Sequence, residues 1–147
     1  MQPQDDECYI FTDEALERLL ANGSEQSHAI FEANDSKKRH RVTSNVRSDF
    51  LAAFADDEAM LSGGFATVAR KDIDNRLAAS FHDKLQNVQG INEPGVPDKI
   101  FLIAVARRVG ASLVVGNDLD SGPSFSKLCE MLEVPYIGAA EFLTKYE

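Results

Sequence analysis

The sequence is poor in cysteine, has no long apolar run and is short of positive charge, and each deficit narrows what the chain can be. Its two cysteines, Cys8 and Cys129, are too few for a disulfide framework and lack metal-ligand spacing. Cys129 falls within an apolar helical pattern, so we expect a buried, reduced thiol there. No apolar run approaches membrane-spanning length, and residues 1–10 carry no basic signal-peptide start. We therefore expect a cytoplasmic protein with no membrane segment.

The formal net charge of −9 argues against broad electrostatic binding to nucleic acid, because neutralising phosphates requires lysine and arginine. It does not exclude a nuclease that grips phosphates through metal ions. The dense basic run at residues 37–41 is interpreted as a solvated connection rather than an RNA-binding patch. His28, His40 and His82 are scattered, form no zinc-binding set, and are expected at the surface.

Strand-like and helix-like segments alternate along the chain, which has the length and composition of one globular domain, residues 1–147. Each connection is long enough for a crossover, so the pattern predicts a three-layer α/β/α sandwich with a central, mostly parallel sheet. Strands are expected at residues 8–12, 40–43, 112–115 and 134–137, with residues 65–71 ambiguous. Helices are expected at 13–21, 24–34, 46–61 (capped by Ser44 or Asn45), 72–88, 98–109, 123–132 and 139–146.

Four aspartates attract attention as a candidate site, although each also has an ordinary explanation. Asp13 and Asp98 fall where helices begin and could simply cap them. Asp118 lies in a turn-rich segment that favours aspartate. Asp49 lies on the flank of an apolar helix face, where a carboxylate needs solvent, an arginine or a metal ion.

Taken together, three of these acids are expected at strand ends or helix starts along one edge of a parallel sheet, where ligands of such sheets bind. Clustered carboxylates repel one another unless a cation intervenes. Mg²⁺ and Mn²⁺ suit sites made of oxygen ligands, and Mg²⁺ usually keeps waters that a substrate phosphate can replace. The sequence therefore predicts a divalent-metal site.

Three segments carry a resemblance to a known family: residues 97–142 (PDKIFLIAVARRVGASLVVGNDLDSGPSFSKLCEMLEVPYIGAAEF), residues 41–54 (RVTSNVRSDFLAAF) and residues 9–20 (YIFTDEALERLL). Their order of acids, apolar helix, Gly-Ala step and Val-Pro strand resembles the PIN-domain ribonucleases over nearly the whole chain. Members of that family commonly cleave RNA with Mg²⁺ or Mn²⁺, and many are toxins silenced by a small antitoxin protein.

Carried over residue by residue, the resemblance implies an acidic site made of Asp13, Asp49, Asp98 and Asp118. Metal contacts are expected from Asp13, Asp98 and Asp118, and Asp120 matches a second acid often found just beyond. Further candidates, for contact with the RNA backbone, are Lys37, Lys38, Arg39, Arg41 and Arg47. RNA and a small antitoxin are the expected partners, and a homodimer is a further possibility.

The chain departs from the family pattern at three positions near these acids. Glu14 stands where Thr, Ser or Asn commonly follows the first acid, and Gly116 stands where Thr or Ser is common. Asp49 replaces the more usual Glu, and the segment SGPS after Asp120 is an insertion. These changes bear on activity more than on fold.

Two hypotheses emerge: a metal-dependent endoribonuclease, or a catalytically impaired PIN-like interaction module whose acidic cleft takes an arginine from a partner. Asp118 and Asp120 also resemble the nucleophile pair of aspartate-dependent phosphatases, but too little chain comes after them for that fold. A nucleotide-binding Rossmann unit is disfavoured because no G-x-G-x-x-G follows a strand.

Overall fold

A five-stranded sheet forms the centre of the computed structural model, which describes residues 8–32, 39–116 and 122–145. The strands are β1 (Tyr9–Phe11), β2 (His40–Thr43), β3 (Ala66–Val68), β4 (Ser112–Val115) and β5 (Tyr136–Gly138). The α-helices are α1 (Asp13–Leu16), α2 (Glu25–Glu32), α4 (Ser44–Ala53), α5 (Glu58–Gly64), α6 (Asp72–Lys84), α7 (Val96–Val109), α8 (Phe125–Leu132) and α9 (Ala139–Thr144). A π-helical turn, η1 (Glu17–Ala21), continues α1, and a 3₁₀ turn, η2 (Ala55–Asp57), precedes α5.

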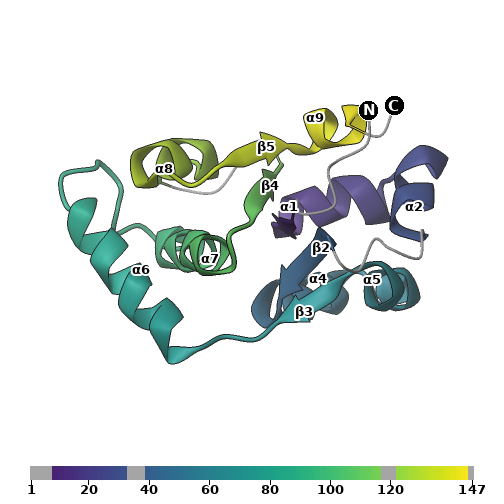
Figure 1. Ribbon diagram of the computed structural model, residues 1–147, viewed down its shortest axis with the longest axis horizontal. Coiled ribbons are helices and arrows are strands. Elements are labelled where there is room, and N and C mark those ends of the chain that lie inside the picture. Colours follow the sequence, from purple (N-terminus) through teal and green to yellow (C-terminus); the bar gives the residue numbers. More distant parts are fainter. Residues whose placement is uncertain (1–7, 33–38, 117–121, 146–147) are drawn as a thin grey trace.

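Every strand pair in the sheet is parallel, and the order across the sheet is β3-β2-β1-β4-β5. Helices α7 and α8 lie on one side of the sheet, with α6 packed on the outer side of α7, while α1, α2, α4, α5 and α9 lie on the other side (Figure 1). Parallel strands need long crossovers that return over the sheet, which is why helices cover both faces. The predicted three-layer α/β/α sandwich is confirmed.

Aromatic side chains fill the layer between the sheet and α2, α5 and α9, and His40 lies among them. The imidazole of His40 is 1% exposed. Its ring centroid lies between 5.2 and 6.3 Å from five aromatic ring centroids, those of Tyr9, Phe11, Phe31, Phe65 and Phe142. The prediction of a surface position is therefore wrong for His40, because this residue lies on β2 with its side chain facing the core.

The predicted helix over residues 46–61 is wrong in its continuity and in its cap. Thr43, not Ser44 or Asn45, caps α4, since the Val46 amide donates to Thr43 Oγ1 over 3.2 Å. Phe54 leaves the helical conformation (φ −132°, ψ 59°), and the chain continues as η2 and then α5. The Phe54 ring packs against Phe50, with 5.1 Å between ring centroids, so packing between side chains accompanies the break.

The remaining segment boundaries agree with the predictions to within a few residues. The ambiguous segment 65–71 contains β3, and Ser24 caps α2 through the amide of Ser27. Helix α7 begins at Val96, two residues earlier than predicted, and α6 ends at Lys84, four residues earlier than predicted. The predicted strand 134–137 corresponds to β5, which starts later, at Tyr136.

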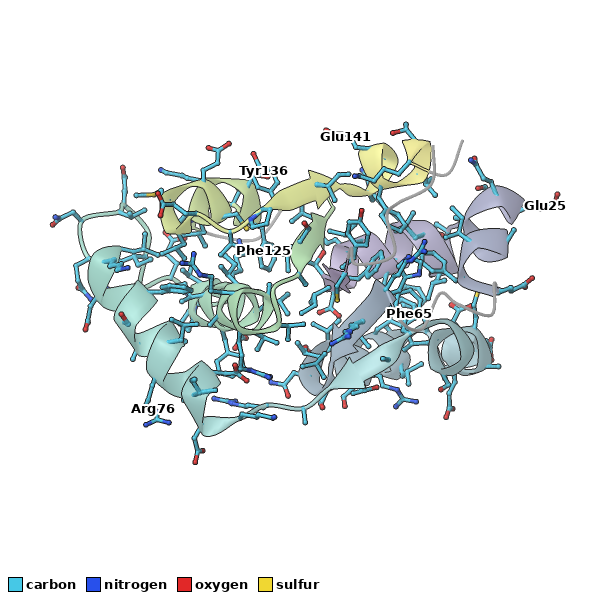
Figure 2. All side chains as sticks on the ribbon, viewed as in Figure 1. Glu25, Phe65, Arg76, Phe125, Tyr136 and Glu141 are labelled. Atoms are coloured by element: carbon cyan, nitrogen blue, oxygen red, sulfur yellow. The ribbon has the colours of Figure 1, made fainter. Side chains whose placement is uncertain are left out.

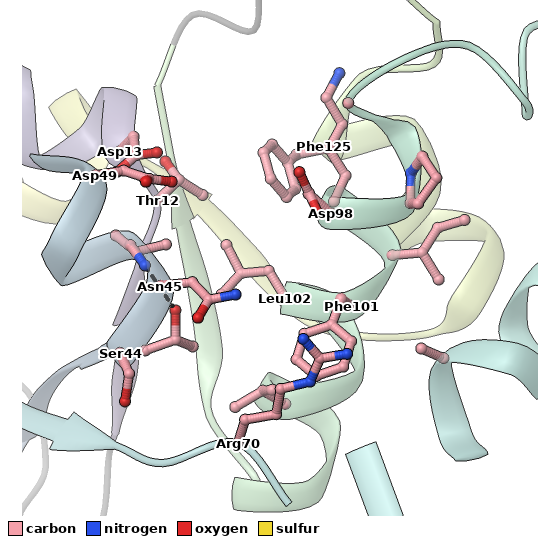
Figure 3. Close-up of a pocket in the computed structure, with 18 of the residues that line it drawn as sticks. Thr12, Asp13, Ser44, Asn45, Asp49, Arg70, Asp98, Phe101, Leu102 and Phe125 are labelled. Atoms are coloured by element: carbon pink, nitrogen blue, oxygen red, sulfur yellow. Dashed lines mark hydrogen bonds between the residues drawn. The ribbon is translucent and has the colours of Figure 1, made fainter. Parts of the chain in front are cut away.

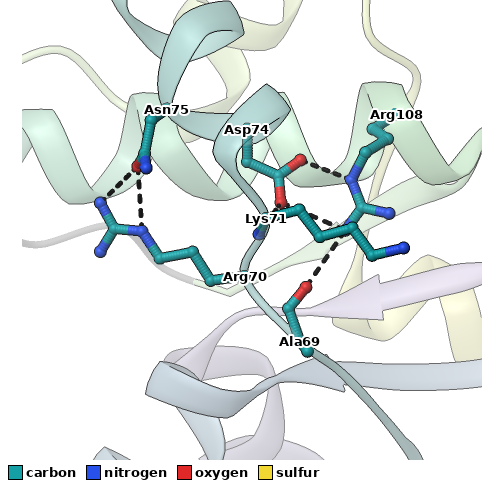
Figure 4. Close-up of polar contacts among 6 residues, drawn as sticks. All are labelled: Ala69, Arg70, Lys71, Asp74, Asn75 and Arg108. Carbon is teal, nitrogen blue, oxygen red and sulfur yellow. Dashed lines mark hydrogen bonds and ion pairs between the residues drawn. The ribbon is translucent and has the colours of Figure 1, made fainter.

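Asp74 and Arg108 form a partly buried ion pair that joins α6 to α7 (Figure 4). Asp74 is fully buried, and it accepts hydrogen bonds from the Arg108 guanidinium and from the Lys71 amide (2.9 Å). Arg108 also donates to the Ala69 carbonyl over 3.2 Å, which fastens the segment between β3 and α6. Burial alone would raise the pKa of Asp74, but the hydrogen bonds and positive charges around it lower that pKa below its ordinary value.

The prediction of a buried, reduced thiol at Cys129 is confirmed. Cys129 is a buried free thiol, and burial, assisted by the neighbouring Glu130 charge, raises its pKa to about 12. Such a thiol is unreactive at neutral pH. Over the described part of the chain, no helix is both long and apolar enough to span a membrane.

Replacing Asp74 by alanine should lower the free energy of unfolding by about 2 kcal/mol, because Arg108 and the Lys71 amide both lose their acceptor in partly buried hydrogen bonds. Asp83→Asn is the matched control: it removes one negative charge from an exposed position on the same helix. The control should change the free energy by less than about 0.5 kcal/mol. Urea unfolding followed by circular dichroism measures both variants, and equal losses would contradict a specific role for Asp74.

The stabilisation from Asp74 should also fade in acid. Its pKa in the folded state lies below the ordinary value of 3.8, so its contribution is complete above that pH. The contribution is lost as the pH falls through the folded pKa, because the carboxyl then becomes protonated in both states. The difference in unfolding free energy between wild type and Asp74→Asn should thus stay constant from neutral pH to about pH 5 and shrink below about pH 4. A difference that instead grew on acidification would contradict this.

Candidate active site

The chain reverses its direction of travel across the sheet between β1 and β4. The first three strands are laid down outward from β1 to β3, whereas the chain then crosses to β4 and continues to β5 on the other side. At such a switch point the loops after two neighbouring strands diverge to opposite faces, leaving a crevice at the carboxyl edge where ligands bind in open α/β sheets. A pocket of about 510 Å³ opens at this edge.

Three of the predicted site acids line this pocket (Figure 3). Asp13 follows β1, Asp49 lies in α4, and Asp98 lies in the first turn of α7. Figure 3 shows Asp13 on α1 and Asp49 on α4 at one side of the pocket, and Asp98 on α7 at the other side. All three side chains are exposed, so solvent reaches the carboxylates, and Asp49 avoids the cost expected for an unpaired carboxylate on an apolar face.

The ordinary explanation for Asp13 and Asp98, that they cap helices, is wrong for both. Thr12 is the N-cap of α1, and its Oγ1 accepts from the Ala15 amide over 3.2 Å. Gly95, with φ 90°, is the N-cap of α7. Each acid therefore lies inside its helix, in the first turn, where the helix dipole favours a negative charge.

Threonine caps place the residues around the pocket in a repeated way. Thr12 ends the segment after β1 and Thr43 is the last residue of β2, and each caps the helix that follows. Both threonines line the pocket and are buried, at 3% and 8% exposure. Because each hydroxyl is tied to a helix N-terminus, the chain turns sharply at the sheet edge and directs the following residues, Asp13 and Ser44, to the rim.

The other predicted site residues divide into two groups. Asp118, Asp120, Lys37 and Lys38 lie outside the described residues. The structure describes the three arginines predicted to contact RNA, and none of them lines the pocket with the acids: Arg39, Arg41 and Arg47. Arg41 is half-buried on β2, and Arg47 donates to Ser62 Oγ over 3.0 Å on α5.

Within the ranges that the structure describes, no three His, Cys, Asp or Glu side chains approach closely enough to hold one metal ion. The donor types nevertheless suit a hard divalent cation, because the pocket offers carboxylates from Asp13, Asp49 and Asp98 and an amide from Asn45. These are the residues that would supply the oxygen ligands of such an ion.

Sequence reasoning missed two cations that line the pocket. Lys99 is 2% exposed, and its Nζ donates to the Pro123 carbonyl over 3.1 Å and lies 5.7 Å from the Phe125 ring centroid. Arg70 is exposed and stacks on Phe101, with its Cζ 4.0 Å from the ring centroid. Lys99 could have been found from its position next to Asp98 at the start of a largely apolar helix. Arg70 could not, because it lies in segment 65–71, whose secondary structure was ambiguous.

The two departures from the family pattern, Glu14 and Gly116, meet in space. A Cβ placed on Gly116 would lie 2.6 Å from the Glu14 Cβ and 3.0 Å from its carbonyl carbon. Real contacts of this kind are essentially never so short, and backbone as well as side chain would have to shift. The end of β4 therefore lies directly against α1, and position 116 has no room for the Thr or Ser side chain that is common in the family.

Gly116→Ala should accordingly destabilise the protein by about 1–3 kcal/mol, because overpacking here forces α1 away from β4. Gly63→Ala is the matched control: Gly63 is an exposed residue of α5, and a Cβ there would meet nothing within 4 Å. The control should be neutral or slightly stabilising, because alanine favours the helical conformation more than glycine does. Thermal unfolding by calorimetry compares the two, and a loss no larger at position 116 than at position 63 would refute the close packing.

A scan of protein-family models finds none that matches the chain, and a search of curated proteins finds no match either. The family resemblance given by the sequence therefore stays a prediction. The functional interpretation of the chain accordingly depends on the residues that line the switch-point pocket.

Proposed function

We propose that the chain is a divalent-metal-dependent endoribonuclease with a PIN-like site. One observation carries the proposal: acids from three remote segments, Asp13, Asp49 and Asp98, line one pocket at the switch point of a parallel sheet. The first turns of helices gather at this edge in any parallel α/β sandwich, so the proposal rests on the further fact that these three carboxylates line one concave, solvent-accessible pocket.

The roles of the acids follow from their positions. Asp13 and Asp98 are the proposed metal contacts, joined by Asp118 on the strength of the sequence alone. Asp49, which lines the same pocket, completes the acidic set or orients a water molecule. A bound Mg²⁺ or Mn²⁺ would lower the pKa of a coordinated water and neutralise charge on the phosphate. Asp120, which also follows β4 in the sequence, is the candidate for a further metal contact.

The opposite wall supports a nucleotide ligand. Phe101 and Phe125 are half-buried and, with Leu102, give the pocket an apolar side next to Asp98 (Figure 3). Bases of single-stranded nucleic acid stack on such rings without requiring a particular sequence. A pocket with acids on one wall and aromatic rings on the other suits a phosphodiester at the acids and a base beside the rings.

The resemblance extends the proposal to a biological role, that of the toxin of a toxin–antitoxin pair. A small partner protein could silence the site by placing an arginine into the acidic pocket, where three carboxylates would receive it. A strongly acidic protein also attracts a basic partner over long range.

A second candidate function is a PIN-like interaction module without catalysis. It is favoured by the packing of Gly116 on Glu14, which excludes a hydroxyl group from position 116. Such a module would keep the acidic pocket for a partner and need no metal ion. Isolation of a stoichiometric small protein together with the absence of Mn²⁺ binding by calorimetry would support this candidate over the nuclease.

The nuclease proposal predicts that Asp13→Asn and Asp98→Asn each lower RNA cleavage at least about 100-fold, because each removes a charge that holds the metal. Asp83→Asn, at an exposed position outside the pocket, is the matched control and should cleave like wild type. Cleavage of a labelled RNA is measured with Mn²⁺, with Mg²⁺ and with excess EDTA. Equal cleavage by wild type and both pocket variants, or cleavage unaffected by EDTA, would defeat the assignment.

A further inference from the structure

We infer that Arg70 is the anion-binding group of the switch-point pocket, and that it holds a backbone phosphate of single-stranded RNA next to the one at the acids. The inference rests on the proposed function for the identity of the anion. The anion site itself is inferred from the different partners of two neighbouring arginines, Arg70 and Arg108.

These two arginines flank the N-terminal turn of α6 and differ in their partners (Figure 4). Arg108 is paired with the carboxylate of Asp74, so its charge is neutralised within the fold. Arg70 instead bonds the neutral amide of Asn75: its Nε and Nη2 donate to Asn75 Oδ1 over 3.0 and 2.6 Å. The positive charge of Arg70 is thus held in place without being cancelled.

The orientation of the Arg70 guanidinium is fixed on a second side as well. One face of the group stacks on the Phe101 ring, 4.0 Å from the centroid. While Asn75 engages Nε and Nη2, Nη1 makes no hydrogen bond to the residues that the structure describes. A planar group that is stacked and held in this way loses little entropy when its outer edge binds a phosphate in the bidentate manner typical of arginine.

The place of Arg70 in the pocket selects the ligand. Arg70 and Asp98 both line the pocket, with Phe101 and Leu102 between them along α7 (Figure 3). Lys99, the lysine of this lining, is 2% exposed and committed to the Pro123 carbonyl, whereas Arg70 is exposed. A ligand anchored through a cation at the acids and through a guanidinium farther along the wall must carry more than one negative group, as a chain of phosphodiesters does.

The test is binding of a short fluorescein-labelled single-stranded oligoribonucleotide, followed by fluorescence anisotropy over a series of salt concentrations. Ca²⁺ replaces Mg²⁺, and a gel confirms that the probe stays intact. Arg70→Ala should weaken binding about tenfold and reduce the slope of log affinity against log salt by about 0.7, the value of one phosphate contact in a single strand. Arg70→Lys should keep the slope, because it keeps the charge, while losing part of the affinity with the planar stack.

Arg76→Ala is the matched control, because Arg76 is an exposed arginine on α6 that points away from the pocket (Figure 2). This variant should change the affinity by less than about twofold and the salt slope by less than about 0.2. Asn75→Ala removes the side-chain amide that holds the Arg70 guanidinium. It should weaken oligonucleotide binding while keeping the salt slope, because the charge of Arg70 remains. Thermal unfolding of each variant shows whether the fold is retained, and Arg70→Lys keeps the charge readout available should Arg70→Ala unfold.

The outcomes separate this inference from the proposed function. Loss of affinity and slope in Arg70→Ala, in a protein that cleaves no RNA with any metal, supports the anion site and defeats the nuclease. Cleavage that depends on Asp98 together with unchanged binding in Arg70→Ala supports the nuclease and overturns this inference. Absence of oligonucleotide binding by the wild-type chain, or an equal loss in Arg70→Ala and Arg76→Ala, also overturns it.

Discussion

The pairing of β1 with β4 is the constraint on which the rest of the molecule depends. Their ladder is extended at both ends, by Ser112 N donating to Cys8 O over 3.0 Å and by Thr12 N donating to Val114 O over 3.1 Å. About a hundred residues separate these strands in the sequence, and joining them side by side creates the switch point. It also carries α7, which directly precedes β4, to the carboxyl edge, so that Asp98 faces Asp13 across the pocket. Gly116 makes the junction possible, because its missing Cβ lets the end of β4 lie against α1.

Local sequence patterns were enough to predict the helices, the strands and their arrangement in layers. They failed to predict the features that depend on tertiary structure, such as the position of a helix cap. Strand and helix periodicities are properties of short windows, so the parallel sandwich could be predicted from them. Helix caps could not be placed as firmly, since Thr12-Asp13 and Thr43-Ser44-Asn45 each offer several good caps. Intrinsic preference ranks threonine below aspartate, asparagine and serine. The structure uses threonine in both places because the end of the strand, and not intrinsic preference, fixes where each helix begins: Thr12 directly follows β1 and Thr43 is the last residue of β2.

The same division applies to the pocket. The convergence of Asp13, Asp49 and Asp98 was predictable, because parallel strands bring their carboxyl ends to one edge whatever the details. Arg70 was not, since its position depends on where β3 ends and α6 begins within a segment that has no clear periodicity. The burial of His40 was missed for a related reason: it lies in a basic run, and only its pairing with Tyr9 on β1 shows that it faces the aromatic layer.

The N-terminal turn of α6 holds both the ion pair that fastens the helix and the residue that orients the proposed anion-binding arginine. The buried carboxylate of Asp74 pairs with Arg108, and the pair fastens α6 and the preceding segment to α7. Asn75, the next residue, takes Arg70 and leaves its charge intact. Exchanging the two side chains would reverse the outcome: a carboxylate at position 75 would neutralise Arg70, and an amide at position 74 would leave Arg108 without its ion pair. The chain has a net charge of −9, so a carboxylate within reach of Arg70 would form an ion pair with it. The Arg70 guanidinium therefore keeps its charge because an amide at position 75, and not a carboxylate, holds it.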